Sequence, residues 1–217
     1  MENLILYSYY RSSASYRVRI GLHFKNIAFE YRPLHLVKEG GMQLKSEFKS
    51  LNPMAQVPLL VHGNFKLSQS MAILFYLDEN FKGPKLIPSN PQIRAKALEL
   101  SEIINSGIQP LQNLSVSNEI GKRFNQPKEA QLEWNKHWIH KGLTAVETLL
   151  KFQKSKFCLG DQISLVDCFL IPQVYSAKRF GVELIDFPNI LEVYNNTQEL
   201  EAFQKAAPEA QIDFEAN

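Results

Sequence analysis

The sequence predicts an α/β domain over residues 1–82 followed by an all-helical domain over residues 92–217. Up to residue 82, short apolar runs alternate with helical periodicity, whereas only helical patterns follow residue 92. Between them, residues 83–91 contain three prolines and a glycine. Because proline removes hydrogen bonds from helices and from strand ladders, this stretch is expected to be a linker.

The first domain is expected to have the order βαβ–ββα. A short apolar run at residues 4–7 is typical of a buried strand, and serines ahead of Val18 and Leu22, at helical spacing, are good N-cap residues. The turn at residues 62–64 indicates a hairpin. We expect strands at 4–7, 28–33, 57–61 and 65–67, a helix that contains Val18, Leu22 and Lys25, and helices over 43–50 and 71–77.

The second domain is expected to contain four helical stretches, over residues 92–120, 128–154, 164–180 and 189–205. The first should bend, because it contains Gly107 and Pro110. The third opens on a capping box in which Ser164 is followed by Asp167 in place of the usual Glu.

Composition excludes several classes of protein. Apolar residues make up 45% and charged residues 21%, which is ordinary for a globular chain and excludes disordered, collagenous and coiled-coil proteins. A net charge of only +2 argues against nucleic-acid binding. The chain has no run of 18 apolar residues and no signal-like start, so we expect no membrane span and a location in the reducing cytoplasm. Cys158 and Cys168 lie in apolar contexts and are expected to be buried thiols.

No metal site is expected. His137 and His140 have a spacing that can bind metal on a helix, but no third ligand lies nearby, and a solvated or capping role is favoured. Motifs for mononucleotide, dinucleotide, zinc-protease and serine-hydrolase sites are absent from the sequence.

One serine-rich motif lies where a strand meets a helix, at Ser12, Ser13 and Ser15. A helix N-terminus carries about half a positive charge and free N–H groups, so it stabilises a thiolate or carboxylate beside it. A serine hydroxyl can donate a further hydrogen bond to a thiolate. Simple helix capping is the alternative explanation.

Two further motifs in the same domain could also bind polar or charged groups of a ligand. Pro58 opens a strand, and a cis Val57–Pro58 bond would leave the Val57 backbone free to pair with an extended peptide, although most X–Pro bonds are trans. Gln69 and Ser70 precede an apolar helix, whose start would hold a second anion. A sulfur site, a strand edge and a carboxylate site in this order describe a glutathione pocket.

Longer stretches of the sequence resemble the zeta-class glutathione transferases, the maleylacetoacetate isomerases. The resemblance covers essentially the whole chain. It is carried by residues 7–20 (YSYYRSSASYRVRI), 51–58 (LNPMAQVP), 69–73 (QSMAI), 108–115 (IQPLQNLS) and 160–167 (GDQISLVD). The first and fourth of these stretches are specific to the zeta class, whereas the others are shared by glutathione transferases generally.

The resemblance implies a glutathione transferase fold, with a thioredoxin-like N-terminal domain on a mixed four-stranded sheet and an all-α C-terminal domain, in a homodimer. It implies that Ser12 holds the glutathione thiolate with Ser13 beside it, and that Arg11 and Arg179 hold substrate carboxylates. The implied glutathione-binding residues are Ser12, Ser13, Ala14, Ser15, Tyr16, Arg17, Gln43, Val57 beside a cis Pro58, Gln69, Ser70, Gln109, Asn113, Leu114 and Ser115.

The implied activity is the glutathione-dependent cis–trans isomerisation of maleylacetoacetate to fumarylacetoacetate in tyrosine and phenylalanine breakdown. The glutathione thiolate would add reversibly to the double bond of this small anionic substrate. A zeta-like transferase that conjugates or dehalogenates small α-haloacids is one alternative, and a non-enzymatic binding module with this fold is another. The complete serine motif and the Gln69–Ser70 pair argue against the module.

The sequence departs from the family pattern at two positions. Ala14 stands where the family typically has cysteine, and Tyr16 stands where it often has tryptophan. The first departure weakens any mechanism in which the protein's own cysteine attacks the substrate. It leaves intact the mechanism in which glutathione supplies the nucleophile.

Overall fold

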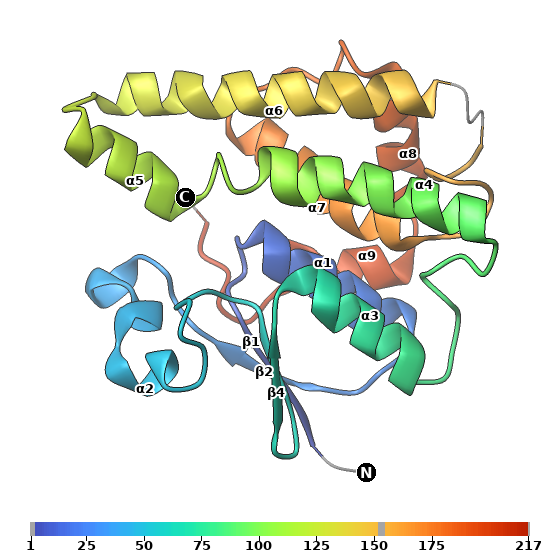
Figure 1. Ribbon diagram of the computed structural model, residues 1–217, viewed down its shortest axis with the longest axis horizontal. Helices are drawn as coiled ribbons and strands as arrows, with labels where there is room; N and C mark the ends of the chain where they lie inside the picture. The colour runs from blue at the N-terminus through green and yellow to red at the C-terminus, as the bar shows by residue number, and fades with distance from the viewer. Residues whose placement is uncertain (1–2, 152–154, 217) are drawn as a thin grey trace. The chain divides into compact units, whose positions relative to one another are not determined.

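The structure is a computed structural model that describes residues 3–151 and 155–216. The chain divides into two compact units, the first comprising Met1–Leu86 with Glu199–Asn217 and the second Ile87–Gln198. The first unit contains a four-stranded sheet with helices and the second is helical, which confirms the predicted fold class (Figure 1). The predicted domain boundaries at residues 82 and 92 stay a prediction.

The sheet of the first unit has the strand order β2-β1-β3-β4. Its strands are β1 (Leu4–Ser8), β2 (Glu30–Pro33), β3 (Leu59–His62) and β4 (Phe65–Ser68). β1 runs parallel to β2 and antiparallel to β3, and β3 runs antiparallel to β4, so the sheet is mixed as predicted. A parallel pair needs a long crossover connection, which is supplied here by helix α1 (Ser13–Phe24).

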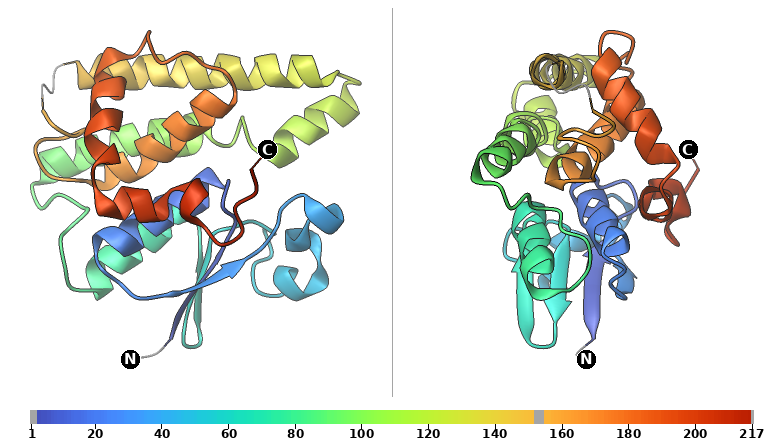
Figure 2. Two further views of the ribbon diagram at one scale, coloured as in Figure 1. Left: turned by 180° about the vertical axis from the view of Figure 1, so that it is seen from behind. Right: turned by 90° about the vertical axis from the view of Figure 1, so that its right-hand side faces the viewer.

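The other helices of the first unit include one that comes from the far end of the chain. These elements are η1 (Lys38–Gly40), η2 (Met42–Leu44), α2 (Ser46–Lys49), α3 (Ser70–Asn80), α9 (Glu201–Ala206) and η4 (Pro208–Ala210). The single helix predicted over 43–50 is therefore two short ones, since Lys45 between them is extended. Figure 2 shows α9 lying alongside α1, an arrangement that the sequence pattern does not predict.

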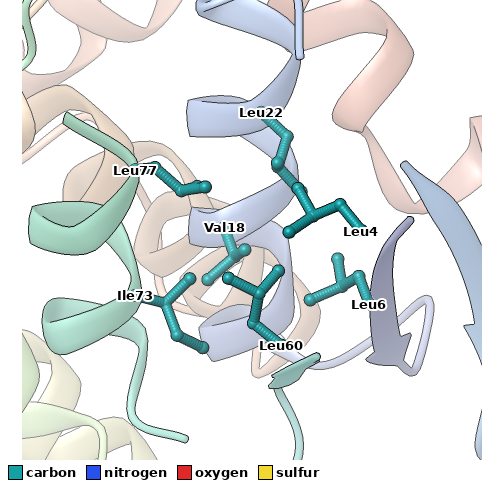
Figure 3. Close-up of a cluster of buried hydrophobic side chains, with 7 residues drawn as sticks. All are labelled: Leu4, Leu6, Val18, Leu22, Leu60, Ile73 and Leu77. Carbon is teal, nitrogen blue, oxygen red and sulfur yellow. The ribbon is translucent and has the colours of Figure 1, made fainter. Parts of the chain in front are cut away.

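The core of the first unit lies where β1, β3, α1 and α3 meet. Figure 3 shows its side chains converging: Leu4, Leu6, Val18, Leu22, Leu60, Ile73 and Leu77, none more than 4% exposed. Burying one such side chain contributes about 1.5–3 kcal/mol. The core thus fixes the directions of α1 and α3, and with them the two helix starts that the sequence motifs occupy.

The chain leaves the first unit at a buried ion pair. Lys25 Nζ lies 3.3 Å from Asp78 Oδ1 and donates to the carbonyl of Pro84 at 3.0 Å. Asp78 Oδ1 also accepts a hydrogen bond from the Leu86 amide at 2.8 Å. Breaking a buried pair leaves a charge uncompensated, so this pair holds the first residues of the proline-rich stretch against the unit.

Two of the helices predicted for the second domain are broken. The unit contains α4 (Pro91–Glu102), the π-helical turn η3 (Ile103–Ile108), α5 (Leu114–Arg123), α6 (Lys128–Leu150), α7 (Leu165–Arg179) and α8 (Pro188–Gln198). The bend predicted in residues 92–120 is a complete interruption between η3 and α5. A single helix over 189–205 is wrong, because Leu200 is extended and separates α8 from α9. The predicted end of the 128–154 helix, at residues 152–154, lies outside the described residues.

The predicted capping box at the start of α7 is confirmed. Asp167 Oδ2 accepts hydrogen bonds from the Ser164 amide at 2.8 Å and the Ser164 hydroxyl at 2.9 Å, and Asp167 Oδ1 accepts one from the Cys158 amide at 3.0 Å. Cys158 and Cys168 are buried thiols, as predicted. Burial is the main cause that holds the pKa of the Cys158 thiol well above its usual range.

Candidate active site

Helix α1 is preceded by Ser12, which caps the helix without using its hydroxyl hydrogen. The Ser12 backbone is extended, and its Oγ accepts a hydrogen bond from the Ser15 amide at 3.2 Å. A hydroxyl that accepts in this way still has its own hydrogen to donate. The first amides of a helix have no partner within it, and Ser13 and Ala14 are only half-buried. This helix start therefore combines N–H donors, a hydroxyl donor and a positive dipole end.

Helix α3 begins without a side-chain cap. The preceding residue, Gln69, has a φ of +74°, a left-handed conformation that residues with a Cβ rarely adopt. Its side chain makes no capping hydrogen bond, although its carbonyl accepts one from the Ile73 amide at 2.9 Å. The amides of Ser70 and Met71 therefore lie at a helix start that can bind an anion. Strained backbone of this kind is concentrated at functional sites.

A buried hydrogen bond brings these two helix starts together. Arg17, on α1, is 1% exposed, and its Nη1 donates to the Ser70 hydroxyl, on α3, at 3.1 Å. The serine motif and the Gln69–Ser70 motif are 53 residues apart in the sequence but neighbours in the first unit. Arg17 adds a fixed positive charge between them.

Gln43, in η2, contains a buried acceptor that is not satisfied. Its Nε2 donates to the Leu36 carbonyl at 3.2 Å, whereas its Oε1 is buried and has no hydrogen-bond partner. Gly41 leaves room for the Gln43 side chain, because a Cβ at residue 41 would lie 2.7 Å from it. Gly41 also has a φ of +96°, a conformation that favours glycine. A buried acceptor without a donor is costly, so Gln43 is suited to an N–H group of a ligand.

The Val57–Pro58 peptide bond is cis, as the resemblance implies. Val57 is largely buried in a hydrophobic cluster with Tyr9 and Tyr10, which immediately precede the serine motif. The loop before Val57 is held by Asn52, whose Nδ2 donates to the Gln56 carbonyl at 2.7 Å. Asn52 is a support that sequence reasoning does not assign, although its place before Pro53 is typical of a turn residue.

Arg11 places a second positive charge beside Ser12. Its guanidinium carbon lies 5.9 Å from the centroids of both the Tyr9 and the Tyr10 rings, and the side chain is half-buried. Burial raises the pKa of the Tyr9 hydroxyl well above its usual value, so Tyr9 is neutral beside this cation. Cation–π contacts at the two rings stabilise Arg11 at the rim of the serine motif.

Tyr16 is buried in α1, and the predicted site residues after residue 86 belong to the second unit. Asn113 caps α5: its Oδ1 accepts from the Ser115 amide at 3.0 Å and from the Ser115 hydroxyl at 2.8 Å. Leu114 is exposed, and Gln109 follows η3. Arg179 ends α7, with its guanidinium carbon 4.2 Å from the centroid of the Phe180 ring. Their roles in binding stay a prediction.

The described part of the chain contains neither a metal-binding cluster nor a membrane-spanning helix. Within residues 3–151 and 155–216, no group of three or more His, Cys, Asp or Glu side chains is placed to hold a metal ion. No helix in the same ranges combines the length and the apolar character needed to cross a membrane.

A thioredoxin-like unit with this site and a separate helical unit define a glutathione transferase fold, and comparisons agree. Residues 2–79 match the family model of the glutathione S-transferase N-terminal domain, and residues 137–199 match that of the C-terminal domain. Maleylacetoacetate isomerase of Mus musculus is 44% identical, over 96% of this chain and 94% of its own length.

Solved structures give the same result. The structure described as holo maleylpyruvate isomerase, a bacterial zeta-class glutathione S-transferase, has a TM-score of 0.94 and 38% identity, covering 97% of this chain and all of its own. Maleylacetoacetate isomerase from Methylobacterium extorquens AM1, with bound malonate and GSH, has a TM-score of 0.94 and 33% identity, covering 98% of this chain and 100% of its own. The chain belongs to the glutathione S-transferase family, in the zeta class that contains the maleylacetoacetate isomerases.

Proposed function

We propose that this protein is a glutathione-dependent isomerase that converts maleylacetoacetate to fumarylacetoacetate in tyrosine and phenylalanine breakdown. The observation that carries the proposal is similarity over almost the full length to maleylacetoacetate isomerases, 44% for the mouse enzyme. The site geometry independently supports the use of glutathione. We further propose that the chain acts as a homodimer in the cytoplasm.

The residues of the first unit match the chemical groups of glutathione. The start of α3, at Ser70, suits a carboxylate, because its amides lack a side-chain cap. The unpartnered Gln43 Oε1 suits an N–H donor. The backbone of Val57 suits the extended peptide, and the start of α1 suits the sulfur. We assign Ser15, Tyr16, Gln109, Asn113, Leu114 and Ser115 to the same binding set on the resemblance.

Ser12 and the start of α1 would keep the sulfur deprotonated. A thiol with a pKa of about 8.5 is only about 3% ionised at pH 7, and lowering that value by about two units needs roughly 2.7 kcal/mol. A helix N-terminus contributes about 0.3–1 kcal/mol, and up to about 2 when partly buried. A hydrogen bond from the Ser12 hydroxyl to the charged sulfur adds about 1.5–3 kcal/mol. In a partly buried site, the two contributions together reach the stabilisation that is needed.

The nucleophile in this proposal comes from glutathione and not from the protein. When bound, glutathione supplies the thiolate that makes rotation about a conjugated double bond possible. Ala14 provides no thiol at the start of α1, and both cysteines of the chain are buried in the second unit. The chain's own residues therefore bind, orient and stabilise charge.

The substrate has two carboxylates, which the proposal assigns to arginines. Arg11 is accessible at the rim of the serine motif, one residue before Ser12. A guanidinium can bind a carboxylate through two parallel hydrogen bonds, which fixes the orientation of the substrate as well as its position. We propose Arg179 as the second carboxylate-binding residue.

The test is an isomerisation assay with purified protein and maleylacetoacetate. Fumarylacetoacetate should form in the presence of glutathione, and formation should stop when glutathione is omitted or replaced by S-methylglutathione, which has no free thiol. An α-haloacid is assayed in parallel. Isomerisation that is independent of glutathione, or turnover of the haloacid alone, would contradict the proposal. Light scattering of the protein as it elutes from a size-exclusion column measures whether it is a dimer.

A further inference from the structure

Residues 211–216, which follow η4, pack against the loop that carries Tyr10 and Arg11. Asp213 makes two hydrogen bonds in the first unit: its Oδ2 accepts from the Tyr10 amide at 3.0 Å, and its Oδ1 accepts from the Tyr31 hydroxyl at 2.6 Å. The Tyr10 amide is thereby satisfied by a residue 203 positions away. A hydrogen bond to a charged acceptor is stronger than one between neutral groups.

Tyr10 is held by the same segment at its side chain and by α1 at its carbonyl. Its hydroxyl donates to the Glu215 carbonyl at 3.4 Å, and its ring lies edge-on to that of Phe214, with centroids 5.6 Å apart. Arg19, fully buried in α1, donates to the Tyr10 carbonyl at 2.9 Å. The side chain, the carbonyl and the amide of Tyr10 are therefore each held by a different contact, and Asp213 holds the amide.

Arg11 and Ser12 depend on this support to different degrees. Ser12 is fixed by α1 and by Tyr9. Its carbonyl accepts from the Tyr16 amide at 2.9 Å, its hydroxyl accepts from the Ser15 amide, and its amide donates to the Tyr9 carbonyl at 3.0 Å. Arg11 precedes the helix, and its guanidinium lies against the Tyr9 and Tyr10 rings. Movement of Tyr10 would therefore displace Arg11 and leave Ser12 in place.

We infer that Asp213 is a positioning residue for anionic substrate: through the Tyr10 amide it holds Arg11 where a substrate carboxylate binds. The inference rests on the proposed function, because that function assigns the carboxylate to Arg11. Asp213 itself touches neither glutathione nor substrate in this assignment. Its loss should weaken binding of the dicarboxylate and leave the sulfur site unchanged.

The test compares Asp213→Ala with Tyr31→Phe. Both substitutions remove a hydrogen bond of the same carboxylate, but only the first removes the acceptor of the Tyr10 amide. Arg11→Ala and the double variant Arg11→Ala/Asp213→Ala complete the set. Each protein, loaded with glutathione, is titrated with malonate as a dicarboxylate probe, and is assayed for the kcat and KM of isomerisation. Ultraviolet absorbance of the bound thiolate and thermal unfolding are recorded for each.

For Asp213→Ala we expect malonate affinity to fall about tenfold and KM to rise similarly, the size of effect that a lost hydrogen bond to a charged group gives. Thiolate absorbance and kcat should change little. Tyr31→Phe should bind malonate within about threefold of the original protein, since Asp213 still accepts the hydrogen bond of the Tyr10 amide in this variant. The double variant should bind malonate no more weakly than Arg11→Ala alone, because residues acting through one another are not additive.

Three results would overturn the inference. The first is an unchanged malonate affinity in Asp213→Ala, and the second is a loss of malonate affinity in Tyr31→Phe equal to that in Asp213→Ala. The third is a double variant in which the losses of malonate affinity of the two single variants add. Failure of the original protein to bind malonate would also overturn it, because Arg11 would then have no anion to bind. If the original protein binds malonate through Arg11 and Asp213 but does not isomerise maleylacetoacetate, the proposed function fails and the inference stands.

Discussion

Ser12 uses one hydroxyl for two purposes. Its oxygen accepts the hydrogen bond that caps α1, and its hydrogen is left to donate to a sulfur. The helix that this cap stabilises is also the helix whose dipole favours the thiolate. In the proposed mechanism, folding and catalysis therefore depend on the same side chain, and substitutions must separate the two effects.

Ser12→Ala should lower isomerase turnover about tenfold or more, since about 1.4 kcal/mol of lost transition-state stabilisation is enough. The lost cap should also cost about 1 kcal/mol of stability. Steady-state rates and urea unfolding measure the two effects. Ser12→Asp retains a capping oxygen without a neutral donor, so it should fold normally and still lose activity, whereas Ser12→Thr should retain both. Near-normal turnover of Ser12→Ala would remove Ser12 from the mechanism.

Ala14→Cys should change isomerase activity by no more than about threefold, because the attacking sulfur belongs to glutathione and a second thiol adds no new step. Turnover with glutathione present, and again with glutathione omitted, measures this. Ala14→Ser serves as a control of similar size. A gain of several orders of magnitude would show that a cysteine at this position takes part in the chemistry.

At the scale of elements, α1 connects most parts of the first unit. It crosses from β1 to β2, packs against α3 and α9, and begins at Ser12. Near its other end, His23 lies edge-on to Phe29, with ring centroids 5.4 Å apart. Burial, helped by the nearby Lys205 and Arg19, holds the pKa of His23 below its usual value of 6.5.

The lowered pKa of His23 should make stability depend on pH. The folded protein binds a proton at His23 less readily than the unfolded chain does, so this contribution is complete above pH 6.5 and is lost as pH falls from 6.5 through the folded-state pKa. Urea unfolding across this range should show stability falling, and His23→Gln should flatten the curve. His140→Gln, at an exposed position of α6, is the control. An unchanged slope in His23→Gln would contradict this assignment.

Sequence patterns that act over a few residues predicted most helices and strands. They failed where packing against residues far away in the sequence determines where an element ends. Apolar runs gave β1 and α3, and a serine cap gave α1, because these features act over a few residues. Nothing local marks the break at Leu200: the chain turns there because Phe203 and Ala206 are buried in the first unit. Likewise, family motifs identify Ser12 and Gln43, whereas the contact of Asp213 with Tyr10 spans 203 residues and has no sequence signature.

At the scale of the whole molecule, the first unit combines residues 3–86 with residues 199–216, which lie far apart in the sequence. Arg19 is the central link, because its fully buried guanidinium donates to the Ala206 carbonyl at 2.8 Å as well as to the Tyr9 and Tyr10 carbonyls. A buried cation that loses an acceptor is strongly destabilising. The α/β unit therefore depends on α9.

A chain ending at Gln198 should lose about 3 kcal/mol or more of unfolding free energy, because Arg19 loses an acceptor and α1 loses its cover. Urea unfolding followed by circular dichroism measures this. A chain ending at Ala210 retains α9 and the Ala206 carbonyl but lacks the 211–216 segment, so it should remain folded and lose mainly malonate affinity. Equal stability of the 198-residue chain and the full chain would contradict the role given to α9.

The hydrogen bond from Arg19 to Ala206 also affects the order of events during synthesis. Because residues 199–216 complete the unit that also contains residues 3–86, a nascent chain cannot finish its α/β unit until residues 199–216 have left the ribosome. The helical unit, made of consecutive residues, can form earlier. The loop that carries Arg11 is thus completed last, and polypeptides released prematurely would lack it.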